Sequence, residues 1–151
     1  MKSLRSVLTA CAAGLLVAFA AQPGTAGPQD EETLEVTFIL HCCEGISFWE
    51  PVLHGMNEAG SLFNVNVDVQ NADGDPERNK DLIETAIANK VDGIVSMVAV
   101  EDVLTEAIQN ASDAGIAVIT ANVDDPEGDG PGGTARLAFV GQDFIASGYR
   151  I

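Results

Sequence analysis

The sequence predicts an α/β fold in which helices cover both faces of a doubly wound, parallel β-sheet. Short runs rich in Val, Ile and Leu alternate with longer segments in which apolar residues recur every three or four positions. The first such run, residues 34–40, has the largely buried character of a strand inside a parallel sheet. The connections are short, which implies right-handed crossovers and the flavodoxin-like strand order 2-1-3-4-5.

Five strands are predicted, at residues 34–40, 65–69, 93–97, 116–120 and 137–140. The second strand alternates Val with Asn and Asp from Val65 to Val69, which suits a half-exposed strand near a sheet edge. A long acidic, Gly-rich loop, 122–136, separates the last two strands.

Helices are predicted between these strands. The first carries an apolar stripe and is expected to end at Gly60; the stripe comprises Trp49, Val52, Leu53, Met56 and Ala59. The second begins at the capping residue Asp75, with Pro76 in its first turn. The third opens at Glu101 and closes at Gly115. A further helix is expected to begin at 141–143.

The N-terminal segment reads as a secretory signal peptide. Lys2 and Arg5 precede the apolar run 7–21, and small residues then predict cleavage after Ala26. Residues 1–26 are therefore expected to be removed, and the Pro-, Gly- and acid-rich residues 27–33 to form a short leader. This pattern predicts a periplasmic or secreted protein.

Charge and cysteine content exclude several classes of function. The 23 acidic against 7 basic residues argue against nucleic acid or an anionic membrane as a partner. Cys11 falls within the signal, whereas Cys42 and Cys43 are adjacent and could form either a vicinal disulfide or two free thiols. The spacing of a cysteine metal site is absent, so no metal and no cofactor are expected.

A ligand is expected at the switch point of the sheet, between the first and third strands, where it would meet the loops 41–50, 98–101 and 121–125. The first loop combines the aromatic pair Phe48 and Trp49 with the polar residues Glu44 and Ser47. Aromatic rings can cover the C–H faces of a pyranose while polar groups bind its hydroxyls, so this loop suits a sugar. The alternative is that Trp49 belongs to the helix stripe and that Phe48 caps the core.

Polar residues also follow the fourth strand. Asn122 and Asp124 could bind sugar hydroxyls, or they could belong to a solvated turn with local hydrogen bonds. The alternative of an exported α/β enzyme would have to use His41 with Cys42 or Cys43, which carry the only candidate nucleophile. No catalytic residue is expected, and the protein is predicted not to be an enzyme.

Several segments together resemble the type I periplasmic sugar-binding proteins of the ribose/galactose-binding group. They are Ser47-Phe48-Trp49, residues 79–83, residues 91–95, and residues 116–120 followed by Asn122. Residues 139–143 resemble that family's first crossover between lobes. The resemblance implies a substrate-binding protein of an ABC importer, with a sugar as ligand and a membrane permease as partner. It also implies that Phe48 and Trp49 sandwich the sugar and that Asn122 binds a hydroxyl.

The resemblance further divides the chain. Residues 34–140 are expected to form the N-terminal lobe, and 141–151 the crossover and the start of a missing second lobe. The sequence therefore reads as a receptor truncated to its first lobe, or as a single lobe that works alone. The same pocket is also compatible with another partner, a membrane sensor to which the protein would present its ligand-bound face.

Overall fold

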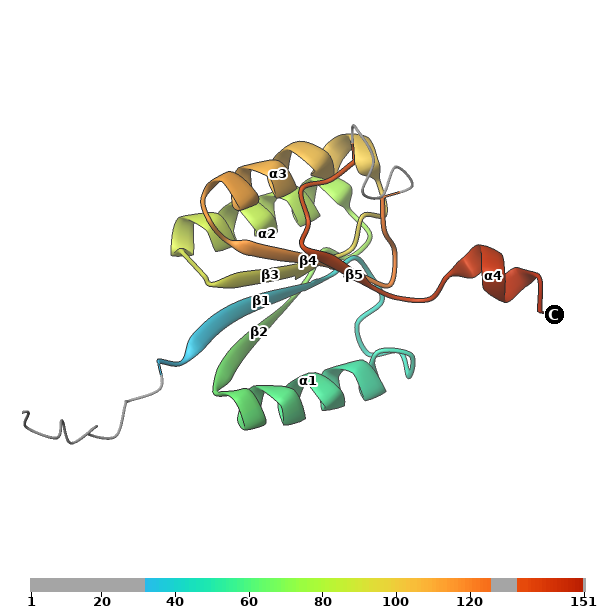
Figure 1. The fold of residues 1–151 in the computed structure, drawn as a ribbon, viewed down its shortest axis with the longest axis horizontal. Coiled ribbons are helices and arrows are strands. Elements are labelled where there is room, and N and C mark those ends of the chain that lie inside the picture. The colour runs from blue at the N-terminus through green and yellow to red at the C-terminus, as the bar shows by residue number, and fades with distance from the viewer. Residues whose placement is uncertain (1–31, 126–132, 151) are drawn as a thin grey trace, which may run out of the picture. The chain divides into compact units, whose positions relative to one another are not determined.

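The computed structural model describes residues 32–125 and 133–150. Within them, five parallel strands form one sheet in the order β2-β1-β3-β4-β5, which confirms the predicted doubly wound α/β class and strand order (Figure 1). The strands are β1 (Leu34–Leu40), β2 (Val65–Asn71), β3 (Gly93–Ser96), β4 (Ala117–Ala121) and β5 (Ala138–Val140).

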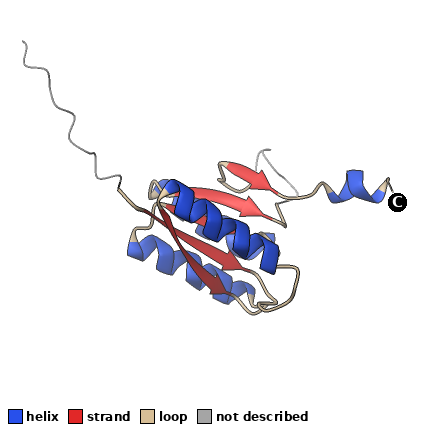
Figure 2. Ribbon diagram, turned by 90° about the horizontal axis from the view of Figure 1, so that it is seen from below, coloured by secondary structure: helices blue, strands red, loops and turns tan. Residues whose placement is uncertain are grey.

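Helices lie on both sides of this sheet (Figure 2). They are α1 (Glu50–Phe63), α2 (Pro76–Asn89) and α3 (Glu101–Asp113), and a short helix, α4 (Phe144–Gly148), follows β5 in the chain. Helices α2 and α3 pack together on one face, and α1 covers the opposite face next to β2 (Figure 1). None of the helices in the described ranges is long and apolar enough to cross a membrane.

Strand β1 is an interior strand of the sheet, because it pairs on both of its edges. It runs in register with β2 from Leu34 opposite Val65 to Leu40 opposite Asn71, and it pairs with β3 from Val36 opposite Gly93. Since all strands are parallel, the loops that follow β1, β3 and β4 emerge at the same edge of the sheet.

The hydrophobic core is divided between the two faces of the sheet, because successive residues of β1 point to opposite sides. Ile39 faces α2 and α3, in a cluster whose largest members are Ile39, Ile83, Ile94, Leu104, Ile108 and Val118. The opposite face carries a smaller cluster of Phe38, Leu40, Trp49 and Met97. This second cluster lies directly beneath the loop that follows β1.

Local signals placed the start of α2 correctly. The Asp75 carboxylate accepts hydrogen bonds from the backbone N–H groups of Glu77 and Arg78, at 3.0 and 3.4 Å. These bonds satisfy donors that the first turn of a helix leaves unpaired. Helix α3 begins at Glu101 and ends at Asp113, with Gly115 at a φ of +82° just beyond it, as predicted.

The predicted end of the first helix was wrong. Helix α1 continues past Gly60 to Phe63 and is terminated by Asn64 in the left-handed conformation, with φ of 54°. A Cβ atom at position 60 would lie 2.7 Å from the carbonyl oxygen of Val65. Gly60 therefore lets the helix approach the start of β2 and is not a stop signal.

We expect the two glycines of α1 to respond oppositely to alanine. Gly55→Ala should raise the free energy of unfolding by about 1 kcal/mol, because alanine favours a helix interior and the new Cβ meets nothing within 4 Å. Gly60→Ala should lower it by about 1–2 kcal/mol, because the new Cβ collides with backbone. Urea denaturation of both variants measures the difference, and stabilisation by Gly60→Ala would contradict the close approach.

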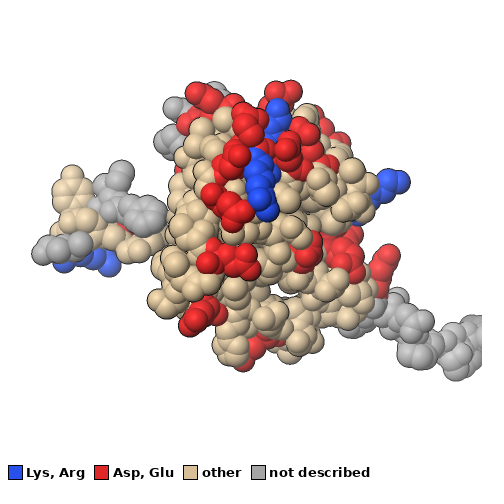
Figure 3. All heavy atoms as spheres, turned by 180° about the vertical axis from the view of Figure 1, so that it is seen from behind, with Lys and Arg blue, Asp and Glu red and all other residues tan. Residues whose placement is uncertain are grey.

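The remaining boundaries differ from the predicted ones by one or two residues, and α4 begins at Phe144, directly after the predicted helix start at 141–143. The predicted signal peptide, its cleavage site, leader residues 27–31 and loop residues 126–132 lie outside the described residues. Acidic side chains spread over much of the face shown in Figure 3, in keeping with the net charge of −16.

Candidate functional site

The loop that follows β1, residues 41–49, is shaped by backbone hydrogen bonds. The N–H of Gly74 donates to the carbonyl of His41 at 2.7 Å, which ties the start of the loop to the turn before α2. The N–H of Ile46 donates to the carbonyl of Cys43, and that of Trp49 to the carbonyl of Ile46, at 3.3 and 3.1 Å. The loop therefore forms two successive turns that lead directly into α1.

The adjacent cysteines form a disulfide, which answers the question that the sequence left open. Cys42 is half-buried and Cys43 is exposed. Cys43 takes a left-handed backbone conformation with φ of 67°. While this bond is intact neither sulfur is a thiolate, and so neither can act as a nucleophile.

Trp49 lies in the core, and its side chain is only 3% exposed. It packs in the cluster with Phe38, Leu40 and Met97. Its indole N–H donates to the carbonyl of Cys42 at 3.2 Å. This placement favours the alternative in which Trp49 belongs to the helix stripe and supports the loop from below.

Phe48, by contrast, is 55% exposed. Its ring meets the edge of the Trp49 ring at 4.8 Å between centroids and an angle of 85°, a favourable geometry for two aromatic rings. Glu44 and Ser47 are exposed in the same loop. Of the predicted aromatic pair, Phe48 therefore presents its surface to solvent, whereas Trp49 fixes its position.

The loop after β4 holds the other two predicted residues. Asn122 is half-exposed and has a φ of 61°, and its backbone N–H donates to the carbonyl of Val140 at 3.0 Å. The N–H of Val98, after β3, donates to the carbonyl of Val123 at 3.0 Å. Backbone bonds thus join the loops that follow β3 and β4.

The Asp124 carboxylate is engaged within the protein. Arg136 donates to it from Nε at 2.8 Å and from Nη2 at 2.7 Å, and the Thr120 hydroxyl donates at 2.6 Å. The side chains of Arg136 and Asp124 are 7% and 17% exposed. Burial raises the pKa of Asp124, but the hydrogen bonds from Arg136 and Thr120, together with the charge of Arg136, outweigh it and hold the pKa below its usual value.

Arg136 was not among the residues predicted to form the site. One signal could have found it, because Arg136 is the one basic residue of the acidic segment 122–136. A guanidinium in such a segment favours a bidentate pair with a neighbouring carboxylate. Because the Asp124 carboxylate already accepts these hydrogen bonds, it could bind a ligand only while paired with Arg136 or after that pair is broken.

His41 links the first loop to the third strand. Its Nδ1 lies 3.0 Å from the sulfur of Met97, and its Nε2 lies 3.2 Å from the sulfur of Cys42. Burial lowers the pKa of His41, so the neutral imidazole is favoured. The structure thus brings the loops after β1, β3 and β4 to one edge of the sheet, as the topology predicted.

The family profile described as a periplasmic binding protein domain matches residues 36–151. The chain belongs to this family. No curated protein matches it.

This periplasmic binding protein domain is similar to several solved structures. A carbohydrate transporter from Acidothermus cellulolyticus 11B, solved in complex with myo-inositol, is 29% identical with a TM-score of 0.70, and the match covers 79% of this chain and 40% of that one. GanP, a glucose-galactose binding protein from Geobacillus stearothermophilus, is 22% identical with a TM-score of 0.69, covering 80% and 41%. The second likeness shows the fold alone. The chain spans about 40% of the length of these structures.

Cavities in the periplasmic binding protein domain do not by themselves mark a complete site. At the loop edge, a cavity of about 50 Å³ lies among His41, Asp75, Asn79 and Val100. Ligand pockets are usually about 300–1,000 Å³, so this cavity is too small for a sugar. A ligand at this edge would therefore have to lie on the surface of the loops.

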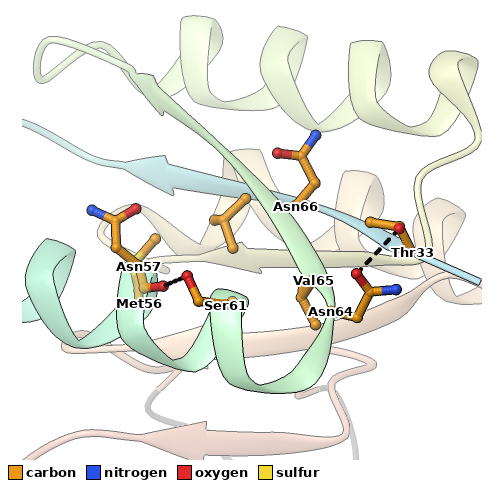
Figure 4. Close-up of a pocket in the computed structure, with 9 residues that line it drawn as sticks. Thr33, Met56, Asn57, Ser61, Asn64, Val65 and Asn66 are labelled. Carbon is orange, nitrogen blue, oxygen red and sulfur yellow. Dashed lines mark hydrogen bonds between the residues drawn. The ribbon is translucent and has the colours of Figure 1, made fainter. Parts of the chain in front are cut away.

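A larger hollow of about 370 Å³ lies between α1 and the start of β2, at the opposite end of the strands (Figure 4). Several of its polar side chains already bond within the protein: the Thr33 hydroxyl donates to Asn64 Oδ1 at 3.3 Å, and the Asn66 amide donates to Glu35 at 2.7 Å. Ligands of open parallel sheets bind at the carboxyl ends of the strands, so this hollow is not the candidate site. In the described part of the chain, no three His, Cys, Asp or Glu side chains are grouped to hold a metal ion.

Proposed function

We propose that this chain is the carbohydrate-binding component of an ABC importer and that it acts outside the cytoplasm. The observation that carries the proposal is the exposed ring of Phe48 at the carboxyl edge of the sheet, fixed from below by Trp49. Membership of the periplasmic binding protein family supports it. The likeness to a carbohydrate transporter in complex with myo-inositol supports a polyhydroxylated ligand.

In this proposal Phe48 covers the apolar C–H face of the sugar ring. Glu44 and Ser47, from the loop after β1, and Asn122, from the loop after β4, bind hydroxyl groups of the sugar. Asp124 contributes to sugar binding while it is paired with Arg136, and Trp49 positions the ring of Phe48. The role is binding without catalysis. The enzyme alternative needs a free thiol next to His41, whereas both sulfurs are bonded to each other.

We also propose a division of the chain for this role. Residues 1–26 direct export and are cleaved after Ala26, and 27–33 form the leader. Residues 34–140 form the N-terminal lobe, and 141–151 begin the crossover to a second lobe. A membrane permease is the proposed partner of the two-lobed protein.

The proposal is tested by titrating the chain with myo-inositol, glucose and galactose while its amide resonances are followed by NMR. We expect saturable shifts confined to residues 41–50, 98–101 and 121–125. Phe48→Ala should weaken the binding about tenfold, because an aromatic contact contributes about 1.4 kcal/mol. Asn122→Ala should weaken it as well.

Phe63→Ala is the matched control, because Phe63 is also an exposed ring, at 69%, but lies at the far end of α1. It should leave the sugar affinity unchanged. The absence of saturable shifts with every sugar would refute the proposed function. Equal losses in Phe48→Ala and Phe63→Ala would refute the proposed site.

A further inference from the structure

We propose that the Cys42–Cys43 disulfide is itself a sugar contact: together with Phe48 it forms the apolar surface on which the C–H face of the ring lies. The inference rests on the proposed function and deepens it, because it adds a second apolar contact and makes sugar binding depend on the oxidised pair. Neither cysteine was expected to contact the ligand from the sequence.

The disulfide lies at the carboxyl edge of the sheet, where it follows the end of β1 by one residue. Cys43 is exposed there, in the same 41–49 loop as Phe48. Trp49 contacts both parts of this loop, because its indole donates to the backbone carbonyl of Cys42 and its ring contacts that of Phe48. The second ring expected to cover the sugar is therefore buried, and Cys43 and Phe48 are the exposed residues on either side of its contacts.

The disulfide is held in a rigid part of the loop. Cys42 is held by the 3.2 Å bond from Trp49 to its carbonyl, and its sulfur lies 3.2 Å from His41 Nε2. The turn before α2 passes close by, because a Cβ added at Gly74 would lie 4.0 Å from the Cβ of Cys42. The disulfide is thus supported by the core and by the turn before α2. A contact surface ordered before binding loses little entropy when the ligand arrives.

The chemistry of the disulfide suits an apolar contact, because sulfur is soft and polarisable and packs well against apolar groups. Reduction would convert the bond into two thiols, which are weak hydrogen-bond donors. It would also open the covalent ring formed by Cys42 and Cys43 and so remove a constraint on Cys43, whose backbone is left-handed with φ of 67°. Both changes would weaken the apolar contact that the disulfide offers to a sugar ring.

The test compares the oxidised chain with the same chain treated with dithiothreitol, using myo-inositol, glucose and galactose as probes. Dithiothreitol supplies two electrons and two protons, which give two thiols while the reagent becomes its cyclic disulfide. We expect reduction to weaken sugar binding at least tenfold, with the amide spectrum of β1, β3 and β4 unchanged. The Cys42→Ser/Cys43→Ser double variant should bind as weakly and should not respond to dithiothreitol.

A direct contact is distinguished from a merely structural role by intermolecular NOEs. Sugar C–H protons should show NOEs to the β protons of Cys43 and to the Phe48 ring. NOEs to Phe48 without any to the cysteines, or an affinity that does not change on reduction, would overturn the inference and leave the proposed function intact. Absence of sugar binding by the oxidised chain would overturn both.

Discussion

Trp49→Ala is expected to lower the free energy of unfolding by about 3–5 kcal/mol, the range for removing a large aromatic side chain from a packed core. The indole is buried against Phe38, Leu40 and Met97. Its removal also leaves the Cys42 carbonyl without the hydrogen bond that it now receives. Because Trp49 is the one tryptophan of the sequence, the measurement is urea denaturation followed by circular dichroism.

Two variants serve as controls for this prediction. Phe48→Ala should cost less than about 1 kcal/mol, since the ring that it removes is mostly in water. Trp49→Phe should lower the free energy of unfolding by an amount between those of Trp49→Ala and Phe48→Ala, because it keeps an aromatic ring but loses the indole N–H. Equal destabilisation by the alanine variants at 48 and 49 would contradict the division between an exposed and a supporting ring.

Arg136→Met is expected to lower the free energy of unfolding by about 2 kcal/mol at pH 7. The substitution removes two charge-assisted hydrogen bonds from a largely buried carboxylate. The hydrogen bond from the Thr120 hydroxyl to the Asp124 carboxylate remains. The expected cost is below the range of about 3–5 kcal/mol for fully buried pairs, because Asp124 keeps some contact with water. Urea denaturation at pH 7 measures it.

The Asp124–Arg136 pair also makes the free energy of unfolding depend on pH. The pKa of Asp124 is lower in the folded protein than its usual value of about 3.9, so the folded state binds this proton less readily than the unfolded state. Its contribution to stability is present above the unfolded pKa and is lost as the pH falls through the folded one. Without Arg136, its hydrogen bonds and its charge no longer lower the pKa of Asp124, so the loss of stability on acidification should begin at a higher pH.

Arg78→Met is the matched control for Arg136→Met. Arg78 pairs with Asp73 at 2.8 Å, but the two side chains are 53% and 57% exposed. Removal of such a pair should cost less than about 1 kcal/mol. Equal effects of the two arginine variants would show that the Asp124–Arg136 pair is no more than a surface contact.

Much of the fold could be predicted because its signals are local. The alternation of strand and helix patterns predicted the parallel sheet and its strand order, and the Asp75-Pro76 pair predicted the start of α2. Gly60 was misread because its role depends on a carbonyl group of β2 that local patterns do not reveal. A glycine within a helical pattern can mark an end or a close approach, and only the packing distinguishes them.

The site was less predictable, because its features depend on tertiary contacts. Helical spacing did identify Trp49 as a member of the apolar stripe, but nothing in the spacing shows that Phe48 faces solvent. The bonds between Asp124 and Arg136 join residues twelve positions apart across a loop. Cys42 and Cys43 form a disulfide with Cys43 in a left-handed backbone conformation, which their adjacency in the sequence does not specify.

The position of β1 between β2 and β3 also has a consequence for how the chain acquires its structure. Its pairing with β3 joins Val36 to Gly93, so a long segment must close before the central hydrogen bonds form. Such non-local pairing slows folding relative to helical proteins. A nascent chain that has reached only β2 can form the β1–β2 ladder, but it still lacks α2 and α3, which cover Ile39. We therefore expect the early chain to be prone to aggregation until α3 is synthesised.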